Sequence, residues 1–248
     1  NITLYTSARI NKIDRKNRVV YAEDGASAEY DRLLLATGSK PFMLPIEGAN
    51  LEGVIGYRDI KDTNDMIDAA KKHKHAVVIG GGLLGLEAAN GLKIQGMEVT
   101  VIHRNEWLLE KQLDKTAGKM LQKNLEAKGL NFQLKQNTKE LKGDGADGKS
   151  GRVNTIHFTD GSSLPADLVV MAVGIRPNFS LAESAGIYCN KGIVVNDTMQ
   201  TYDPRVYAVG ECVAHRGISY GLVAPLFEMA KVCATHLANF GIGQYKGS

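Results

Sequence analysis

The sequence predicts an α/β fold organised around a parallel β-sheet. Three observations lead to this prediction. In the middle of the chain, short apolar segments alternate with segments of helical spacing, which is typical of consecutive βαβ units. Residues 1–35 alternate between apolar and polar side chains, as the strands of a β-meander do. Residues 223–240 have the spacing of a long amphipathic helix.

The meander is predicted from strands that turn-forming residues separate. The turns are DRKN and EDGAS, and both are rich in residues that favour tight reversals of the chain. The last strand of the meander is the apolar segment 32–36. We therefore expect the first part of the chain to be mostly β-structure.

A first helix is predicted at 62–72, where Asp62 or Thr63 provides the N-terminal cap. The strand and helix alternation follows it. Strands are expected at 76–79, 99–102 and 130–134, and helices at 84–94 and 114–128. This βαβαβ order predicts parallel strands with helices packed on the faces of the sheet. The Gly-, Asp- and Ser-rich segment 142–151 is expected to form a hairpin tip, and later strands are expected at 155–158, 167–173 and 205–209.

Composition and charge exclude several classes of protein. Hydrophobic residues make up 44% of the 248 residues and charged residues 23%, which is ordinary for a globular protein. The net charge of +3, without a long run of like charges, gives no support to a nucleic-acid partner. No segment has the apolar length of a membrane span or the layout of a signal peptide. We expect a cytoplasmic protein without a membrane partner.

The cysteines and the chain ends carry weaker signals. Cys189, Cys212 and Cys233 are far apart and form no C-x-x-C pair, so we expect reduced, mostly buried thiols and no metal site. The chain begins with Asn1 rather than methionine, and we expect it to be a piece of a longer protein. The small, polar tail GIGQYKGS is interpreted as a linker.

A glycine-rich loop joins the first central strand to the helix after it. Gly80, Gly82 and Gly85 form the pattern G-x-G-x-x-G, which in this position is typical of a Rossmann-like dinucleotide-binding unit. Gly80 permits the tight turn, Gly82 lets the backbone approach a pyrophosphate, and Gly85 allows the helix to pack closely on the strand. The helix N-terminus offers N–H groups and a positive dipole end. The expected cofactor-binding residues here are Gly80, Gly81, Gly82, Leu83, Leu84 and Gly85.

The alternative is a glycine turn that only eases helix packing.

The second strand of the unit leaves the choice of nucleotide open. NAD-binding units usually end this strand in a carboxylate that binds the ribose 2′-hydroxyl, but here the strand ends in His103 and Arg104. These two residues could accept the 2′-phosphate of NADPH. They could instead face solvent, with NADH held through its pyrophosphate, so we write the cofactor as NAD(P)H.

Three apolar strands around the loop end in glycine. They are YDRLLLATGSKP upstream, and VVMAVGIRPN and DPRVYAVGEC downstream. Each alone could be a simple exit from a strand into a turn. Together, and in this order around the loop, they resemble the FAD-dependent pyridine nucleotide-disulfide oxidoreductase family.

This resemblance implies two domains. In the family an NAD(P)H-binding Rossmann-like domain, here 45–174, is inserted in a three-layer FAD-binding domain, here 1–44 and 175–248. The resemblance implies that Gly174 faces the nicotinamide. It also implies that Glu87, in the first turn of the loop helix, is the catalytic residue near the nicotinamide and flavin N5; alternatively, its carboxylate only interacts with the helix dipole. The implied flavin contacts are Ala36, Thr37, Gly38, Gly210 and Glu211.

Within the family, three stretches are similar to the large subunit of assimilatory NAD(P)H-nitrite reductases. They are AVGEC, with Glu211 where most of the family has Asp, GLVAPLFEMAKV and EKQLD. This resemblance implies an electron-entry module, in which hydride passes from NAD(P)H to FAD and electrons continue to sirohaem and an iron–sulfur cluster. Three scattered cysteines cannot bind those centres, so we expect them only in missing regions and expect this fragment alone to be inactive toward nitrite.

The resemblance also implies an incomplete flavin site. The family's first G-x-G-x-x-G, which holds the ADP part of FAD, should precede Tyr30, but residues 1–29 contain no such loop. We therefore expect FAD to bind this chain weakly or not at all.

Two other functions are kept as alternatives. One is a flavin reductase of the same fold that serves rubredoxin, ferredoxin or oxygen. The other is a dinucleotide-binding module without catalysis. A disulfide reductase is less favoured because residues 55–78 contain no cysteine, although Cys212 could be a redox thiol rather than a packed residue. The expected partners are small nucleotide cofactors, and the full-length relatives suggest a homodimer.

Overall fold

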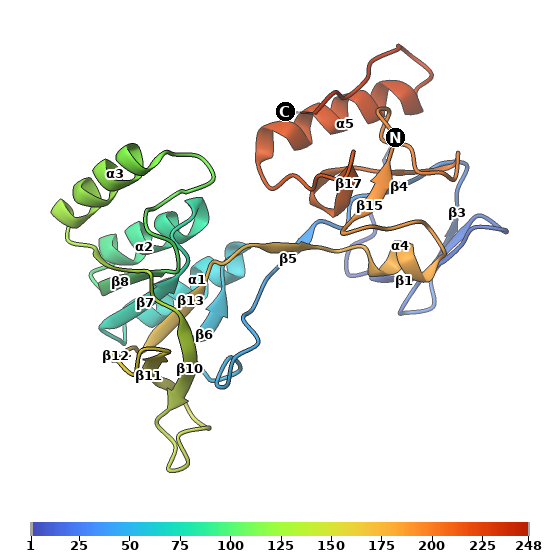
Figure 1. Ribbon diagram of the computed structural model, residues 1–248. Helices are drawn as coiled ribbons and strands as arrows, with labels where there is room; N and C mark the ends of the chain where they lie inside the picture. Colours follow the sequence, from blue (N-terminus) through green and yellow to red (C-terminus); the bar gives the residue numbers. More distant parts are fainter. Residues whose placement is uncertain (1, 248) are drawn as a thin grey trace. The chain divides into compact units, whose positions relative to one another are not determined.

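The computed structural model describes residues 2–247, and they form two compact units (Figure 1). The inserted unit is Pro41–Gly174, and the split unit is Asn1–Lys40 together with Ile175–Ser248. Strands β5 (Ser39–Pro41) and β14 (Ile175–Pro177) pair where the chain passes between the units. The predicted α/β class is confirmed, and each unit has its own hydrophobic core.

The inserted unit is built on a five-stranded parallel sheet. Its strand order is β6-β13-β7-β8-β9, so β13, the last of these strands in the sequence, lies between β6 and β7. The strands are β6 (Val54–Gly56), β7 (His75–Ile79), β8 (Glu98–His103), β9 (Asn131–Leu134) and β13 (Leu168–Met171). The helices are α1 (Ile60–Ala70), α2 (Leu83–Ile94) and α3 (Lys115–Ala127).

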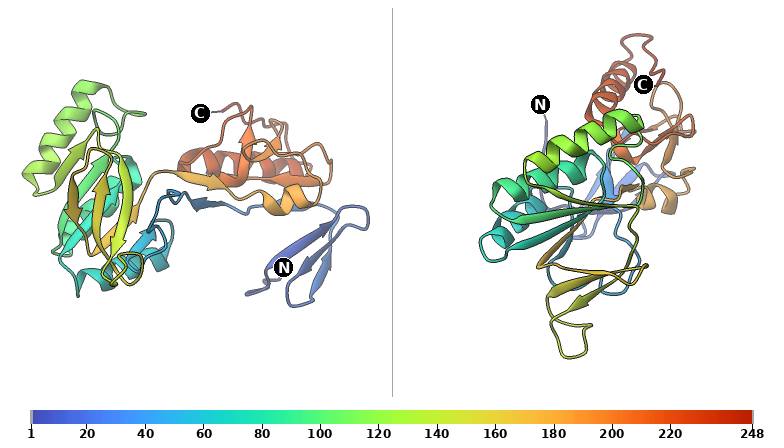
Figure 2. Two further views of the ribbon diagram at one scale, coloured as in Figure 1. Left: turned by 60° about the horizontal axis from the view of Figure 1, so that its bottom comes forward. Right: turned by 60° about the vertical axis from the view of Figure 1, so that its left-hand side comes forward.

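The two faces of this sheet have different covers (Figure 2). Alternate residues of a strand point to opposite faces. Val78 therefore packs with apolar side chains of the three helices, whereas Val77 packs with a three-stranded antiparallel sheet. That second sheet consists of β10 (Thr138–Gly143), β11 (Val153–Phe158) and β12 (Ser163–Pro165).

The prediction of helices on the faces of the sheet is thus right for one face only. The other face is covered by β10–β12, because Leu141, Ile156 and Phe158 bring fully buried apolar side chains to it. The predicted hairpin tip at 142–151 does join two antiparallel strands, β10 and β11. The helix cap is also corrected. Asp59 caps α1, and Asp62 reaches back to the Asp59 N–H from within the helix.

The split unit begins with the meander β1 (Ile10–Asp14), β2 (Val19–Ala22) and β3 (Ser27–Glu29). The predicted last strand of the meander is wrong. β4 (Leu33–Leu35) pairs instead in parallel with β16 (Val206–Ala208), which lies far along the sequence. Sequence pattern cannot reveal that long-range pairing.

The rest of the split unit surrounds this pair of strands. Its strands β15 (Ile193–Val195) and β17 (Val213–His215) are also parallel. The helices are α4 (Ser180–Ser184), the 3₁₀ turn η1 (Gly210–Cys212) and the long α5 (Val223–Leu237). Tyr207, Met229 and Cys233 are fully or almost fully buried in the core that these elements share.

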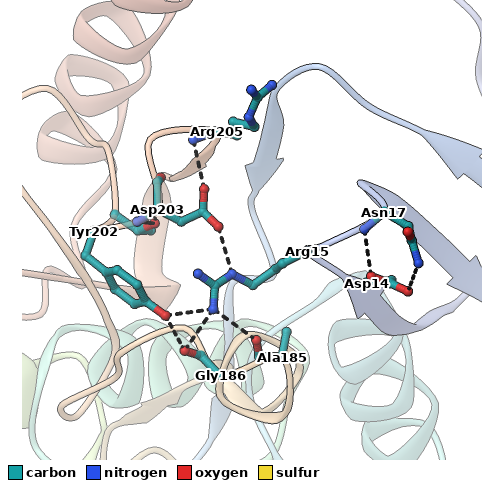
Figure 3. Close-up of polar contacts among 9 residues, drawn as sticks. Asp14, Arg15, Asn17, Ala185, Gly186, Tyr202, Asp203 and Arg205 are labelled. Carbon is teal, nitrogen blue, oxygen red and sulfur yellow. Dashed lines mark hydrogen bonds and ion pairs between the residues drawn. The ribbon is translucent and has the colours of Figure 1, made fainter.

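Arg15 attaches the meander to the rest of the split unit (Figure 3). Its Nε donates to Asp203 Oδ2 at 2.7 Å, and its NH1 group donates to the Tyr202 hydroxyl oxygen at 2.7 Å. The same NH1 group lies 3.3 Å from the Gly186 carbonyl oxygen. One side chain thus joins the meander to two separate loops.

The C-terminal tail is not the free linker that the sequence predicts. Tyr245 is only 2% exposed and belongs to the core of the split unit. Its N–H donates to the Asp197 carbonyl oxygen at 2.8 Å, and its ring lies 5.0 Å from that of His215. The composition of the tail is polar, but this one aromatic side chain binds it to the fold.

Asp197 joins the loop after β15 to the end of β17. Its Oδ1 accepts hydrogen bonds from His215 Nε2 at 2.8 Å and Arg216 Nε at 3.1 Å, and its Oδ2 accepts one from Arg216 at 2.7 Å. Hydrogen bonds from Arg216 and then His215 lower the pKa of Asp197 to about 2. The ionised carboxylate is therefore the form that the fold stabilises.

We expect acidification to remove this contribution to stability. Because the pKa of Asp197 is lowered from 3.8 to about 2 by folding, the contribution is present above about pH 4 and is lost as the pH falls toward 2. Asp197→Asn should therefore flatten the pH dependence of unfolding of the split unit in this range, measured by circular dichroism in urea.

The matched control removes a carboxylate from the other unit. The pKa of Asp160 is also lowered to about 2, by hydrogen bonds from Ser162 and Gln136. Asp160→Asn should change only the acid sensitivity of the inserted unit, which the single tryptophan, Trp107, reports by fluorescence. Equal acid sensitivity of the split unit with and without the Asp197 carboxylate would contradict the prediction.

Candidate functional site

The glycine-rich loop connects the end of β7 to the start of α2. Gly80 has a φ of +127°, and a Cβ there would lie 2.2 Å from the Ala172 carbonyl oxygen. A Cβ on Gly85 would lie 2.0 Å from the Gly80 carbonyl oxygen. Backbone atoms cannot move aside as flexible side chains can. The turn and the close approach of α2 to the strand therefore both require glycine.

Gly82 differs from these two glycines. Its φ is −86°, which any residue adopts, and a Cβ there would meet nothing within 4 Å. Gly82 is the N-cap of α2, and its position has no side-chain hydrogen bond to the first turn. Leu83 and Leu84 follow it, each 41% exposed. The first-turn N–H groups of α2 thus have no side-chain cap, and uncapped N–H groups at a helix N-terminus can bind an anion.

His103 lies beneath this loop. It is only 7% exposed, and its Nδ1 accepts a hydrogen bond from the Gly81 N–H at 3.1 Å. Its Nε2 lies 3.0 Å from Glu110 Oε2, and Glu110 Oε1 accepts from the Asn105 side chain at 2.7 Å. The ring does not face solvent, so that interpretation from the sequence is wrong for His103, and its predicted role toward a 2′-phosphate stays a prediction. Arg104, the next residue, is exposed.

The Glu110 carboxylate is held in its charged form. Burial opposes its charge, but hydrogen bonds from its own backbone N–H and from the Asn105 and His103 side chains outweigh the burial. The pKa of Glu110 therefore lies below its ordinary value. Glu110 belongs to the EKQLD stretch, but no local spacing relates it to His103, so its role could not be predicted from the sequence.

Glu87 is exposed and is the fifth residue of α2. It therefore lies in the second turn of the helix, and the sequence-based placement in the first turn is wrong. The helix dipole acts mainly within the first turn, so the alternative role for this carboxylate is weakened. Gly174, at the end of the inserted unit, has a φ of +118° and no atom within 4 Å of a Cβ position. The roles of Glu87 and Gly174 near a nicotinamide stay predictions.

The split unit brings two of the predicted flavin segments together. Leu35 of β4 pairs with Ala208 of β16, and the Val209 N–H donates to the Leu35 carbonyl oxygen at 3.0 Å. Because the strands are parallel, Ala36-Thr37-Gly38 and Gly210-Glu211 leave the same edge of the pair. Sites in open α/β sheets form at this carboxyl edge.

The backbone at this edge leaves room for a ligand. Gly38 and Gly210 have φ values of +66° and +85°, and a Cβ on either would meet nothing within 4 Å. Glu211 is 6% exposed and accepts a hydrogen bond from the Ser39 hydroxyl at 2.6 Å. The Thr37 hydroxyl donates to the Asn178 carbonyl oxygen at 2.5 Å. Ser39 and Asn178 are supporting residues that no sequence motif predicts.

The cysteines show no feature of a reactive thiol. All three are free, and Cys212 is fully buried with its thiol 3.2 Å from the Val209 carbonyl oxygen. Burial raises the pKa of both Cys189 and Cys233 to about 11. Within residues 2–247, no cluster of His, Cys, Asp and Glu could hold a metal ion, and no helix has the length and apolar character needed to cross a bilayer.

Fold and site together define an α/β protein with a Rossmann-type glycine-rich loop in the inserted unit and an open sheet edge in the split unit. The chain belongs to the pyridine nucleotide-disulphide oxidoreductase family, whose sequence profile matches residues 1–234. The family resemblance inferred from the sequence is thereby confirmed.

Several relatives resemble the chain over nearly its whole length. It is 54% identical to nitrite reductase [NAD(P)H] of Bacillus subtilis, over 100% of this chain and 30% of that protein. It is 49% identical to the assimilatory nitrate reductase electron transfer subunit of the same organism, over 100% of this chain and 31% of that protein. The chain therefore spans about 30% of the length of these curated relatives.

Solved structures share the fold. A ferredoxin reductase from Rhodopseudomonas palustris superposes with a TM-score of 0.90 at 29% identity, over 97% of this chain and 60% of that one. An NAD-dependent persulfide reductase from A. fulgidus gives a TM-score of 0.89 at 29% identity, over 98% of this chain and 46% of that one. Both superpositions cover more of the chain than the inserted unit alone, so the structural similarity includes the split unit.

Proposed function

We propose that this chain is the electron-entry module of an NAD(P)H-dependent nitrite reductase. The observation that carries the proposal is 54% identity to a nitrite reductase [NAD(P)H] over the whole chain. In this proposal a hydride passes from the nicotinamide to a flavin, and electrons continue to sirohaem and iron–sulfur centres in the rest of the protein. A cytoplasmic location and a homodimer stay predictions from the sequence.

The glycine-rich loop fits a dinucleotide. The N–H groups of Gly82, Leu83 and Leu84 would bind the pyrophosphate, because α2 has no side-chain cap and Gly82 has open space in front of it. The exposed Arg104 would lie beside the adenosine ribose and could accept a 2′-phosphate. Glu87 would orient groups near the nicotinamide. These residues bind and position, and the nucleotide supplies the hydride.

The open edge of the split unit fits the flavin end of FAD. Gly38 and Gly210 allow a planar ligand to approach the backbone, and buried Glu211 would hold a polar group of the ligand. When FAD is bound, its chemistry is acceptance of a hydride and release of single electrons. Ser39 would keep the Glu211 carboxylate oriented through its hydroxyl hydrogen bond.

A flavin reductase that serves a small iron–sulfur protein is the second candidate. The TM-score of 0.90 to a ferredoxin reductase favours it, and the chain is also 32% identical to rubredoxin-NAD(+) reductase of Pseudomonas putida, over 57% of that protein. The two candidates predict different electron acceptors. The full-length protein should consume NADH or NADPH in the presence of nitrite if the first is right, and only with added ferredoxin or rubredoxin if the second is right.

Removal of the Arg104 charge tests the proposed nucleotide site. Arg104→Gln should weaken NADPH binding by about tenfold or more, because a charged hydrogen bond to the 2′-phosphate is lost, and should leave NADH binding unchanged. Isothermal titration of the unaltered and altered chains measures both affinities. Lys93→Gln, at the opposite end of α2, is the matched control. Failure of the unaltered chain to bind either nucleotide would overturn the proposal.

A further inference from the structure

We propose that His103 is a positioning residue that holds the nucleotide loop in its binding geometry through Gly81, and that it does not contact the nucleotide. The inference rests on the proposed function of the loop as the NAD(P)H site. The glycine motif of the loop does not require a histidine at position 103, and NAD-binding units usually have a carboxylate there.

Both backbone polar groups of Gly81 are bound by the last residue of β8 and the segment that follows it. The Gly81 N–H donates to His103 Nδ1 at 3.1 Å, and the Gly81 carbonyl oxygen accepts from the Leu109 N–H at 3.0 Å. A Cβ on Gly81 would lie 2.8 Å from both His103 Cγ and Leu108 Cδ2. The imidazole therefore packs directly against the loop, and the middle glycine of GGG, Gly81, is required by this contact.

The hydrogen bonds determine which nitrogen of His103 carries the proton. Nδ1 accepts from a backbone N–H, so it carries no proton. Nε2 must then be the N–H, and it donates to Glu110 Oε2 at 3.0 Å. Asn105 holds the other Glu110 oxygen at 2.7 Å. Glu110 thus selects the tautomer that can accept from Gly81, as a carboxylate partner of an imidazole commonly does.

This arrangement separates the roles of the loop N–H groups. The Gly81 N–H is occupied inside the protein, so the pyrophosphate would be bound by the groups that follow, Gly82, Leu83 and Leu84. Without His103 the buried Gly81 N–H would have no acceptor, and the loop would rotate to satisfy it. Such a rotation would displace the neighbouring N–H groups from the phosphate of any dinucleotide, whether or not it carries a 2′-phosphate.

The inward orientation of the His103 ring also has a consequence for the choice between NADH and NADPH. A carboxylate at the end of this strand would bind the ribose hydroxyl of NADH and repel the 2′-phosphate of NADPH. His103 has turned inward and contributes neither effect. Discrimination between the two nucleotides therefore does not come from this position, and changes at His103 should affect both nucleotides equally.

The test compares two variants at this position by isothermal titration with NADH and with NADPH. His103→Leu removes the acceptor and should weaken both nucleotides by the same factor, on the order of tenfold. His103→Asn places an amide oxygen near the position of Nδ1 and should restore both affinities to within about threefold of the unaltered chain. His75→Asn, at the other end of the same sheet, is the matched control and should change neither affinity.

Each other outcome contradicts the inference. Loss of NADPH affinity alone in His103→Leu would mean that His103 contacts the 2′-phosphate. Unchanged affinity for both nucleotides would mean that the loop needs no support from this ring. If His103→Leu does not fold, His103→Asn still decides the question, since weak binding in that variant would show that an acceptor at this position is not sufficient.

A measurement without nucleotide separates this inference from the proposed function. The nitrogen NMR shifts of the His103 ring should show a proton on Nε2 and none on Nδ1, and the Gly81 amide should exchange slowly with solvent. A proton on Nδ1 would overturn the inference even if both nucleotides bind. The expected tautomer together with no nucleotide binding would overturn the proposed function and leave the contact between His103 and Gly81 established.

Discussion

Gly82→Ala is expected to remove most dinucleotide affinity without destabilising the inserted unit, whereas Gly85→Ala is expected to destabilise that unit. A Cβ on Gly82 would meet no protein atom, so the methyl group should occupy only the space that the pyrophosphate needs. A Cβ on Gly85 would lie 2.0 Å from the Gly80 carbonyl oxygen. One motif thus contains a glycine for the ligand and a glycine for the fold.

The expected magnitudes separate the two variants clearly. Gly82→Ala should weaken NADH and NADPH by at least about tenfold, since the backbone can no longer approach the phosphates. Gly85→Ala should lower the free energy of unfolding of the inserted unit by about 3 kcal/mol or more, the upper range for overpacking. Trp107 fluorescence in urea measures the stability of this unit, and isothermal titration measures the affinities.

Gly91→Ala is the matched control on the same helix. Gly91 is exposed within α2 and a Cβ there would meet nothing within 4 Å. Alanine should raise the stability by up to about 1 kcal/mol through its higher helix propensity, and should leave the affinities unchanged. A stable Gly82→Ala variant that binds both nucleotides as the unaltered chain does would contradict the assignment of the loop.

Tyr207→Ala is expected to have the largest effect on the split unit. Tyr207 is fully buried in the core of that unit. Its hydroxyl oxygen accepts from Arg32 at 2.8 Å and from Gln200 at 2.9 Å, and the hydroxyl proton is then directed to His236 Nδ1 at 3.0 Å. Truncation should cost about 3 to 5 kcal/mol, as for other large aromatic residues in a core.

Tyr207→Phe separates packing from hydrogen bonding. It keeps the ring and removes the hydroxyl group, and it should cost about 1 kcal/mol. For both variants, circular dichroism should show earlier unfolding of the split unit, while the Trp107 transition should stay in place because the inserted unit has separate cores. Equal costs for the two variants would contradict the view that ring packing dominates.

Local pattern predicted some elements well. The apolar segments of β7 and β8 were predicted together with the helix that follows each of them, and α2 and α3 lie within one residue of their predicted bounds at each end. Prediction failed where long-range contacts decide. Leu33–Leu35 has the pattern of a meander strand, but Val206–Ala208 provides its partner. The tail containing Tyr245 has the composition of a linker, but a single aromatic side chain holds it in the core.

The candidate site divides in the same way. G-x-G-x-x-G between a strand and a helix predicted the loop, because glycine is the only residue type whose backbone adopts that turn and that close approach. The role of His103 could not be predicted, since its sequence position is shared by residues that bind a ribose. The His103 ring is bound by Glu110, and the Leu109 N–H binds the Gly81 carbonyl oxygen. No spacing rule relates Glu110 and Leu109 to the loop.

The sequence by itself determined the α/β class, the glycine-rich loop and the family of this protein, because each depends on residue types at short, fixed separations. Only the tertiary structure decided which face of the sheet the helices cover, that the ATG and VGE segments meet at one strand edge, and that His103 turns inward. These features depend on contacts between residues distant in sequence, and their free energies come from burial and hydrogen bonding that exist only once the chain has folded.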